Sequence, residues 1–334
     1  RGSFRIVRLV DNTWVQELEV EGARNKSLCG RALAISGDGT ICAFTTNDYD
    51  GTYAAIHSYQ YDGSSWQQME LDTTWQDDIA GAAIALSEDG TTMAYSAYED
   101  SNAGGPNSWG VLVKTWDGSN WNKKGEPIYF ETGISTQTER YRYLGYYHDA
   151  QGKIQTSGND NPSGGLKLSK DGNTIIMGIP DSVNWLGGHT IKTGMVLVME
   201  YDATFNGAGN TNYNTAFTST PSTSDFGVNG WKRKGVEICG EGYNCMFGTH
   251  VATNTDGTII AASSCAYHEN PDQYNTFVRI MKLHQYTQED ANNGTYYSGA
   301  PRQINSAGKK MLFNHQTAAY SDSWNSPVVG EYYW

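Results

Sequence analysis

The stretch Gly30-Arg-Ala-Leu-Ala-Ile-Ser-Gly-Asp-Gly39 decides the fold, because the chain repeats it. A second copy reads Gly81-Ala-Ala-Ile-Ala-Leu-Ser-Glu-Asp-Gly90. Three further copies, the last of them divergent, occupy residues 163–172, 248–257 and 299–308. The closing glycines stand 51, 82, 85 and 51 residues apart, at Gly39, Gly90, Gly172, Gly257 and Gly308. This spacing indicates a unit of about 51 residues with two insertions.

Each copy predicts a strand that runs into a tight turn. Apolar residues alternate, as at Leu33 and Ile35, which is the period of a strand. Asp-Gly then favours a turn, since glycine adopts positive φ and the carboxylate binds nearby backbone N–H groups. A second predicted strand follows each turn, at 41–44, 92–95, 174–177, 259–262 and 310–313.

Two more strands complete each unit. The third is rich in β-branched and aromatic residues, at 53–61, 110–116, 194–201, 276–283 and 328–334. The fourth opens with a tryptophan that we expect to pack in the core, at Trp14, Trp66, Trp121 and Trp231. Four strands per unit without helical periodicity predict an all-β protein, a β-propeller of four-stranded antiparallel blades.

Short motifs then suggest a family. Phe247-Gly248 before a first strand, Gly178-Ile179-Pro180 after a second, and Gly194-Met195-Val196 opening a third resemble the FG-GAP repeats of integrin-α-type β-propellers. The resemblance extends over nearly the whole chain and implies a propeller fold. It implies little about function, because propellers serve many functions.

The turn carboxylates depart from the calcium-binding form of that family. Such blades carry several alternating carboxylates in the first hairpin, whereas Asp38, Asp171 and Asp256 stand alone here. Calcium needs six to eight oxygen ligands, so we interpret these residues as turn formers and expect no metal or other cofactor. Asp48 and Asp50 are the remaining calcium candidates, although a solvated loop explains them equally well.

The units predict one propeller domain over residues 1–334, with insertions at 126–162 and 203–230. Residues 4–10 align with a third strand, and so do residues 328–334, so both ends fall inside a blade. Two arrangements remain open: a closed ring of about five blades, or part of a larger ring of six to eight blades. The start at Arg1 fits a removed signal peptide and an excerpt of a longer chain alike.

Charge and hydropathy exclude two classes of partner. The chain has 36 acidic and 23 basic residues, a net charge of −13, which disfavours nucleic acids and anionic membrane surfaces. No apolar run is long enough for a membrane-spanning helix, so membrane insertion is not expected.

No catalytic constellation stands out among the motifs, and we therefore predict a noncatalytic module that binds protein partners or assembles with itself. Six residues of the first insertion are candidates for the interaction, because Tyr and Arg are enriched at interfaces; they are Arg140, Tyr141, Arg142, Tyr143, Tyr146 and Tyr147. The alternative is a polysaccharide-binding lectin or a glycan-active enzyme that uses loop carboxylates such as Glu99, Asp100 or Glu269.

Modification motifs favour a secreted or cell-surface protein. Asn25 and Asn293 begin the Asn-x-Ser/Thr pattern of glycosylation. Cys245 is a candidate for a disulfide with either Cys239 or Cys265. Cys29 and Cys42, in contrast, lie about four residues out of register on paired strands, roughly 13 Å at the strand rise, too far apart to bond.

Overall fold

A computed structural model describes fourteen segments of the chain. They are residues 2–22, 29–47, 54–69, 80–99, 108–130, 165–180, 183–186, 189–192, 194–206, 227–234, 238–239, 246–264, 278–282 and 331–333. Every regular element in them is a strand. Within these segments no helix is long and apolar enough to cross a membrane.

Two blades follow the predicted order of four antiparallel strands. Blade 1 consists of β3 (Leu33–Ile35), β4 (Ile41–Asn47), β5 (Ala54–Tyr61) and β6 (Trp66–Gln68). Blade 2 consists of β7 (Ala80–Leu86), β8 (Thr92–Glu99), β9 (Ser108–Trp116) and β10 (Trp121–Lys123), with β11 (Ile128–Phe130) also paired to β9. β11 falls inside residues 126–162, the first predicted insertion.

Blades 3 and 4 repeat the pattern with additions. Blade 3 consists of β12 (Leu166–Leu168), β13 (Thr174–Ile179), β16 (Met195–Tyr201) and β18 (Trp231–Arg233), with short strands β17 (Gly227–Val228) and β19 (Ile238–Cys239). A separate hairpin, which the sequence did not predict, contains β14 (Val183–Leu186) and β15 (His189–Lys192). Blade 4 consists of β20 (His250–Thr253), β21 (Ile259–Ser263), β22 (Val278–Lys282) and β23 (Glu331–Tyr333).

The position of β23 corrects one prediction. Residues 328–334 were expected to form the third strand of a fifth blade, but Glu331–Tyr333 pairs parallel with β22 at the edge of blade 4. A tight hairpin brings a strand back antiparallel, whereas parallel pairing requires a long connection, and the connection from Lys282 to Glu331 is long. The predicted strand at 310–313 lies outside the described residues.

An N-terminal hairpin precedes blade 1. It consists of β1 (Ser3–Val10) and β2 (Thr13–Glu21), which pair only with each other among the described strands. Leu9 pairs with Trp14 in the register in which Tyr61 pairs with Trp66 and Trp116 with Trp121. The hairpin thus corresponds to the third and fourth strands of a blade, as predicted.

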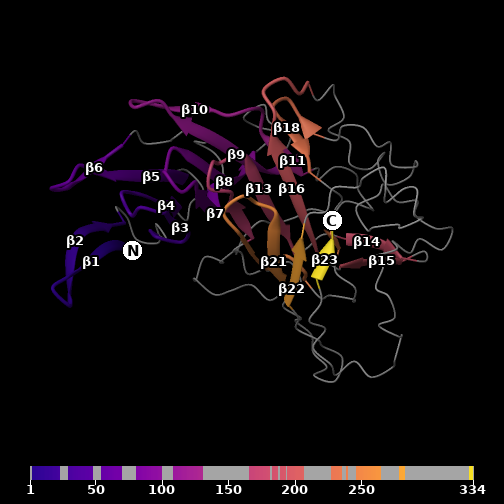
Figure 1. Ribbon diagram of the computed structural model, residues 1–334, viewed down its shortest axis with the longest axis horizontal. Coiled ribbons are helices and arrows are strands. Elements are labelled where there is room, and N and C mark those ends of the chain that lie inside the picture. The colour runs from indigo at the N-terminus through magenta and orange to yellow at the C-terminus, as the bar shows by residue number, and fades with distance from the viewer. Residues whose placement is uncertain are drawn as a thin grey trace.

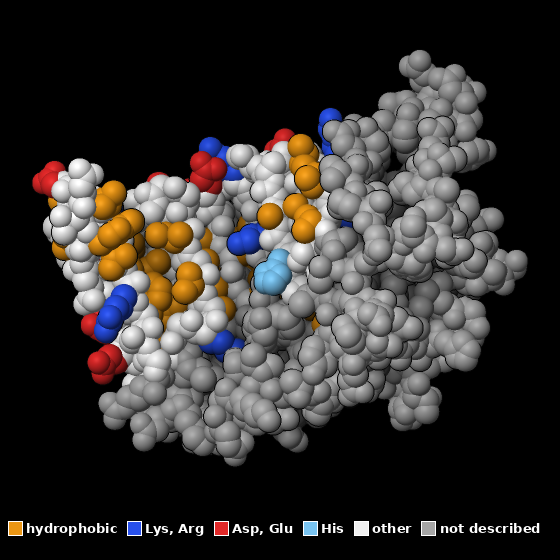
Figure 2. Space-filling model, turned by 90° about the horizontal axis from the view of Figure 1, so that it is seen from below, with side chains coloured by type: hydrophobic (Ala, Val, Ile, Leu, Met, Phe, Trp, Pro, Cys, Tyr) orange, Lys and Arg blue, Asp and Glu red, His pale blue; other side chains and the backbone are white. Residues whose placement is uncertain are grey.

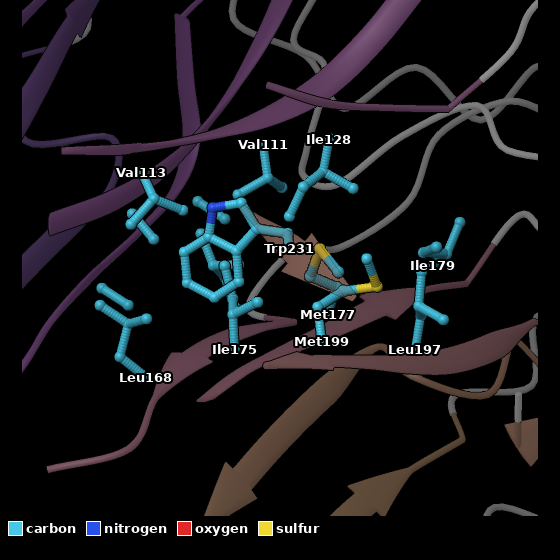
Figure 3. Close-up of a cluster of buried hydrophobic side chains, with 14 of the residues drawn as sticks. Val111, Val113, Ile128, Leu168, Ile175, Met177, Ile179, Leu197, Met199 and Trp231 are labelled. Carbon is cyan, nitrogen blue, oxygen red and sulfur yellow. The ribbon is translucent and has the colours of Figure 1, made fainter. Parts of the chain in front are cut away.

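The blades stand in chain order from hairpin β1–β2 to blade 4 (Figure 1), and one apolar cluster lies between each adjacent pair. We call the face of each blade that lies toward the preceding blade its rear face. Figure 3 shows the cluster between blades 2 and 3, where Val111 and Val113 meet Trp231. The sheet order and these contacts identify an all-β fold of propeller blades.

Candidate functional site

One carboxylate and one serine hydroxyl hold the Asp-Gly turn in blades 1 to 3, and in blade 4 the Asn254 amide oxygen takes the place of the hydroxyl. In blade 1, Asp38 Oδ1 accepts hydrogen bonds from the Ser36 hydroxyl at 2.6 Å and from the Thr40 N–H at 2.9 Å. Ser36 Oγ accepts in turn from the Ile41 N–H at 2.9 Å. Blades 2 and 3 repeat this set at Asp89 and Asp171. The carboxylates are therefore turn formers, as predicted.

The pKa values of these carboxyl groups follow from the same contacts. The Ser36 hydroxyl is the main reason why the pKa of Asp38 lies below its ordinary value of 3.8. In blade 4 the Thr258 hydroxyl does the same for Asp256. Both groups remain ionised near neutral pH, and both accept hydrogen bonds from residues of their own turns. Within the described segments, no group of three or more His, Cys, Asp or Glu side chains could hold a metal ion.

Most other candidate residues lie outside the described segments. They are Asn25, Asp48, Asp50, Asp100, Arg140, Tyr141, Arg142, Tyr143, Tyr146, Tyr147, Cys245, Cys265, Glu269 and Asn293. Cys239 belongs to β19 and Glu99 to β8, but their side chains are not described. The calcium, glycosylation, disulfide and loop-interaction hypotheses therefore stay predictions.

Cys29 and Cys42 are buried free thiols, which confirms that they do not bond to each other. Both belong to the cluster between hairpin β1–β2 and blade 1. Burial raises the pKa of Cys42 to about 12, so its thiol stays protonated and unreactive in the folded protein.

The repeated tryptophans confirm the core prediction in three of four positions. Trp66, Trp121 and Trp231 are buried. Each indole N–H reaches back to the preceding unit: to Glu17 Oε2 at 2.8 Å, to Ser58 Oγ at 3.0 Å and to the Lys124 carbonyl at 2.6 Å, respectively.

Trp14 is the exception. It occupies the same strand position in hairpin β1–β2, yet its exposed fraction is 68%. No preceding blade covers the rear face of this hairpin among the described residues, and Val7 and Leu9 are exposed beside it.

The inner strand of blade 1 is exposed in the same way. Leu33 and Ile35 are 62% and 56% exposed. The counterparts of Leu33 in blades 2 and 3, Ile84 and Leu166, are buried, and so is Leu168, the counterpart of Ile35 in blade 3. We call Val7, Leu9, Trp14, Leu33 and Ile35 the N-terminal face. Figure 2 shows exposed hydrophobic side chains gathered at the end of the molecule where Figure 1 places the N-terminal strands.

Hairpin β1–β2 is fixed on blade 1 by specific contacts. The Phe4 ring stacks on Phe44 with centroids 4.2 Å apart. The Arg8 guanidinium lies over the Tyr61 ring, 4.5 Å from its centroid, and pairs with Glu17 at 2.6 Å. The Arg8 hydrogen bond is the main reason why the pKa of Glu17 is lowered. The exposed side chains therefore lie on an ordered support.

Backbone hydrogen bonds link the turns of neighbouring blades in one direction. The Gly37 N–H donates to the Glu88 carbonyl at 2.7 Å, and the Glu88 N–H donates to the Lys170 carbonyl at 3.0 Å. The Lys170 N–H then donates to the Thr255 carbonyl at 2.7 Å. At the start of this series, no described residue donates to the Gly37 carbonyl.

Sequence reasoning missed the N-terminal face. The repeat pattern treats all copies alike, so it predicted that Trp14 packs in the core. The interaction site was predicted in the first insertion, at residues 140–147. The available signal was that residues 4–21 supply only the third and fourth strands of a unit. Among the described strands, no first or second strand of this unit covers the inner strand of the next blade.

No model of a known protein family matches the chain, and no curated protein matches it. Among solved structures, TolB from Acinetobacter baumannii is similar over 82% of this chain and 44% of its own, with 12% identity and a TM-score of 0.35. Prolyl oligopeptidase B from Galerina marginata is similar over 74% of this chain and 26% of its own, with 12% identity and a TM-score of 0.35. A structure of a nidogen/laminin complex matches over 60% of this chain and 58% of its own, with 12% identity and a TM-score of 0.29.

The chain thus spans less than half the length of TolB. The fold assignment rests on the sheet order of the chain itself, and likenesses at this level assign no activity to it. They do correct one prediction: the chain was expected not to be an enzyme, but similar structures include prolyl oligopeptidases. The exclusion of enzymes is therefore wrong, since it rested on the absence of a recognisable catalytic constellation in the sequence.

Proposed function

We propose that this chain is a cell-surface or extracellular propeller module that binds protein through its N-terminal face, as a component of a larger assembly. The observation that carries the proposal is the exposure of Trp14 at a position where the three other blade tryptophans are buried. The chain's own repeat demonstrates that this position is suited to packing against another sheet.

The chemistry of the face supports a protein partner. Exposed apolar side chains that cluster on an ordered support are typical of interaction sites, and tryptophan is enriched among the residues that dominate binding energy. Arg5 and Glu19, paired at 2.6 Å, provide a polar border beside Val7. An apolar centre with a polar rim is the usual composition of a protein interface.

We also propose that the blades are of the FG-GAP type, and two glycine positions support this. Gly194, at the start of a third strand, forms a bridge to Phe247 and has a φ of 69°. Gly248 has a φ of 92°, and a Cβ there would lie 3.0 Å from the Gly178 Cα. The motif glycines thus meet one another where blades 3 and 4 touch, which gives the short motifs a packing role. The glycosylation motifs at Asn25 and Asn293 favour the extracellular location.

The test is the mass of the assembly in solution. We expect size-exclusion chromatography with light scattering to give a mass above 36.7 kDa that rises with concentration. Trp14→Ser should shift the protein toward the single-chain mass, because it removes the largest apolar group of the face. Gln60→Ser, at an exposed position on β5 of blade 1, is the control and should behave as the wild type. A wild-type chain that stays at its single-chain mass at every concentration would contradict the assembly.

A further inference from the structure

The rear face of blade 1 carries a histidine where the rear faces of blades 2 and 3 carry leucine. In blades 2 and 3 the position belongs to Leu112 and Leu197, which are buried in the clusters toward the preceding blade. In blade 1 it belongs to His57, because His57 pairs with Phe44 in the register in which Leu112 pairs with Tyr95. An ionisable ring therefore occupies a position that two other blades fill with an apolar core residue.

His57 lies within the contact between hairpin β1–β2 and blade 1. Its ring stacks on Phe44 with centroids 5.0 Å apart and an interplanar angle of 5°. Phe44 stacks in turn on Phe4 of β1, with centroids 4.2 Å apart. The Nε2 atom of His57 lies 3.1 Å from Thr46 Oγ1, whereas its Nδ1 atom is buried and forms no hydrogen bond with any described residue. The neutral imidazole fits this environment through one hydrogen bond and its aromatic neighbours.

A proton on His57 changes this balance. The imidazolium is a donor at both ring nitrogens, so the charged form needs an acceptor at Nδ1, and no described residue provides one. Stacking on the Phe44 ring replaces only part of the hydration that a buried cation loses. Burial accordingly lowers the pKa of His57 from its ordinary value of 6.5.

Blade 4 has a permanent cation at the same position. Arg279 pairs with Ala262 in the corresponding register, and its guanidinium lies over the Phe247 ring, 5.3 Å from the centroid. An arginine keeps its charge at every pH that the folded protein experiences, and a leucine has none. His57 is therefore the residue at this position whose charge changes near neutral pH.

The other ionisable groups of this interface keep their charge between about pH 5 and pH 6.5. Those described on hairpin β1–β2, on blade 1 and on the segment between them are Arg8, Glu17, Cys29, Arg31, Cys42 and Tyr59. Burial raises the pKa of both thiols and of the Tyr59 hydroxyl, so these groups stay neutral. The hydrogen bond from Arg8 lowers the pKa of Glu17 from 4.5, so this carboxylate stays ionised. Both arginines stay charged.

We infer that His57 is a pH-sensitive switch between hairpin β1–β2 and blade 1: the neutral ring holds the hairpin on the blade, and its protonation releases the hairpin. A released hairpin carries Trp14 away from Leu33 and Ile35, so the N-terminal face comes apart. The inference goes beyond the proposed function, because the switch acts within one chain whether or not the face binds a partner.

The direction of the response follows from linkage. The folded pKa of His57 is lowered, so the packed state binds the proton less tightly than the released state, in which the ring is hydrated. The contact is therefore at full strength above about pH 6.5 and weakens as the pH falls from there toward the folded value.

Hydrogen exchange of the full chain tests the switch. Peptides from β1 and from β13 of blade 3 are compared at pH 7.0 and pH 5.5, with the unfolded chain at each pH as the reference for intrinsic exchange. Protection of β1 amides should fall at least about threefold on acidification, and one proton with an ordinary pKa in the released state sets an upper limit of about eightfold. Protection of β13 should change less than about twofold, because β13 belongs to a different sheet.

Two variants and one control assign the response to His57. His57→Leu introduces the residue of blades 2 and 3, and His57→Gln keeps a polar side chain near Thr46 without an ionisable ring. In both variants the protection of β1 should no longer depend on pH. His250→Gln, at an exposed histidine of β20, is the matched control and should retain the response. Circular dichroism at pH 7.0 checks that each variant is folded.

Three results would each overturn the switch. The first is β1 protection that is the same at pH 7.0 and pH 5.5 in the wild type. The second is a response that persists in a folded His57 variant, since another group would then cause it. The third is an equal loss in β13, since the whole chain would then be opening. The exchange is measured at a concentration at which the chain is monomeric, so its result is independent of the assembly through Trp14, which the solution mass tests.

Discussion

Trp231 and Trp14 occupy the same position of the repeat, and alanine in place of each should have opposite consequences. Trp231 is fully buried between blades 2 and 3, and its indole N–H donates to the Lys124 carbonyl at 2.6 Å. Truncation of a buried tryptophan to alanine costs about 3–5 kcal/mol of unfolding free energy. Trp14 is 68% exposed, so Trp14→Ala should change that free energy by no more than about 0.5 kcal/mol.

Urea unfolding at 25 °C, followed by far-ultraviolet circular dichroism, measures both changes. A loss of about 3–5 kcal/mol is a large part of the typical total stability of about 5–15 kcal/mol, so Trp231→Ala should lower the midpoint strongly. The titrations should be done at a concentration at which the protein is monomeric, because assembly would add to the measured stability. If Trp14→Ala destabilised the single chain as much as Trp231→Ala, Trp14 would be buried within its own molecule and the N-terminal face would not exist.

Two further predictions concern the turns. Gly39 and Gly90 have φ values of 70° and 71°, so alanine at either is strained; a Cβ at Gly90 also lies 2.7 Å from the Ile41 side chain, whereas at Gly39 it meets open space. Gly90→Ala should therefore lower the unfolding free energy more than Gly39→Ala in the same urea titration, and equal losses would argue against the packing of blade 2 on blade 1. The second concerns pH: because the folded pKa of Asp38 is lowered from 3.8, its contribution is present above about pH 4 and is lost as the pH falls through the folded value. Unfolding free energies at pH 6 and pH 3 should thus differ less in Asp38→Asn than in the wild type, and an unchanged difference would contradict the assigned turn contacts.

The repeat made much of the fold predictable. The second strands of blades 1 to 4 begin at the predicted residues, Ile41, Thr92, Thr174 and Ile259, because apolar alternation and an Asp-Gly turn are local signals. The hairpin β14–β15 and the parallel strand β23 were not predicted. The hairpin lies in the connection between β13 and β16 and has no second copy to compare, and a parallel pairing depends on a partner distant in sequence.

The sequence by itself determined the strand-turn unit, the role of Asp38 and its counterparts, and the tryptophan at the start of each fourth strand. These features depend on contacts within a few residues, so most copies of the repeat show them, although the last copy (299–308) lacks the turn aspartate. Only the tertiary structure decided which copies are covered. Trp14 and Trp231 are the same residue in the same motif, yet one is exposed and the other is buried, because burial depends on whether another sheet lies against the rear face. The candidate site lies where no described sheet packs against the rear face of hairpin β1–β2. The repeat pattern in the sequence does not indicate which sheet packs against which.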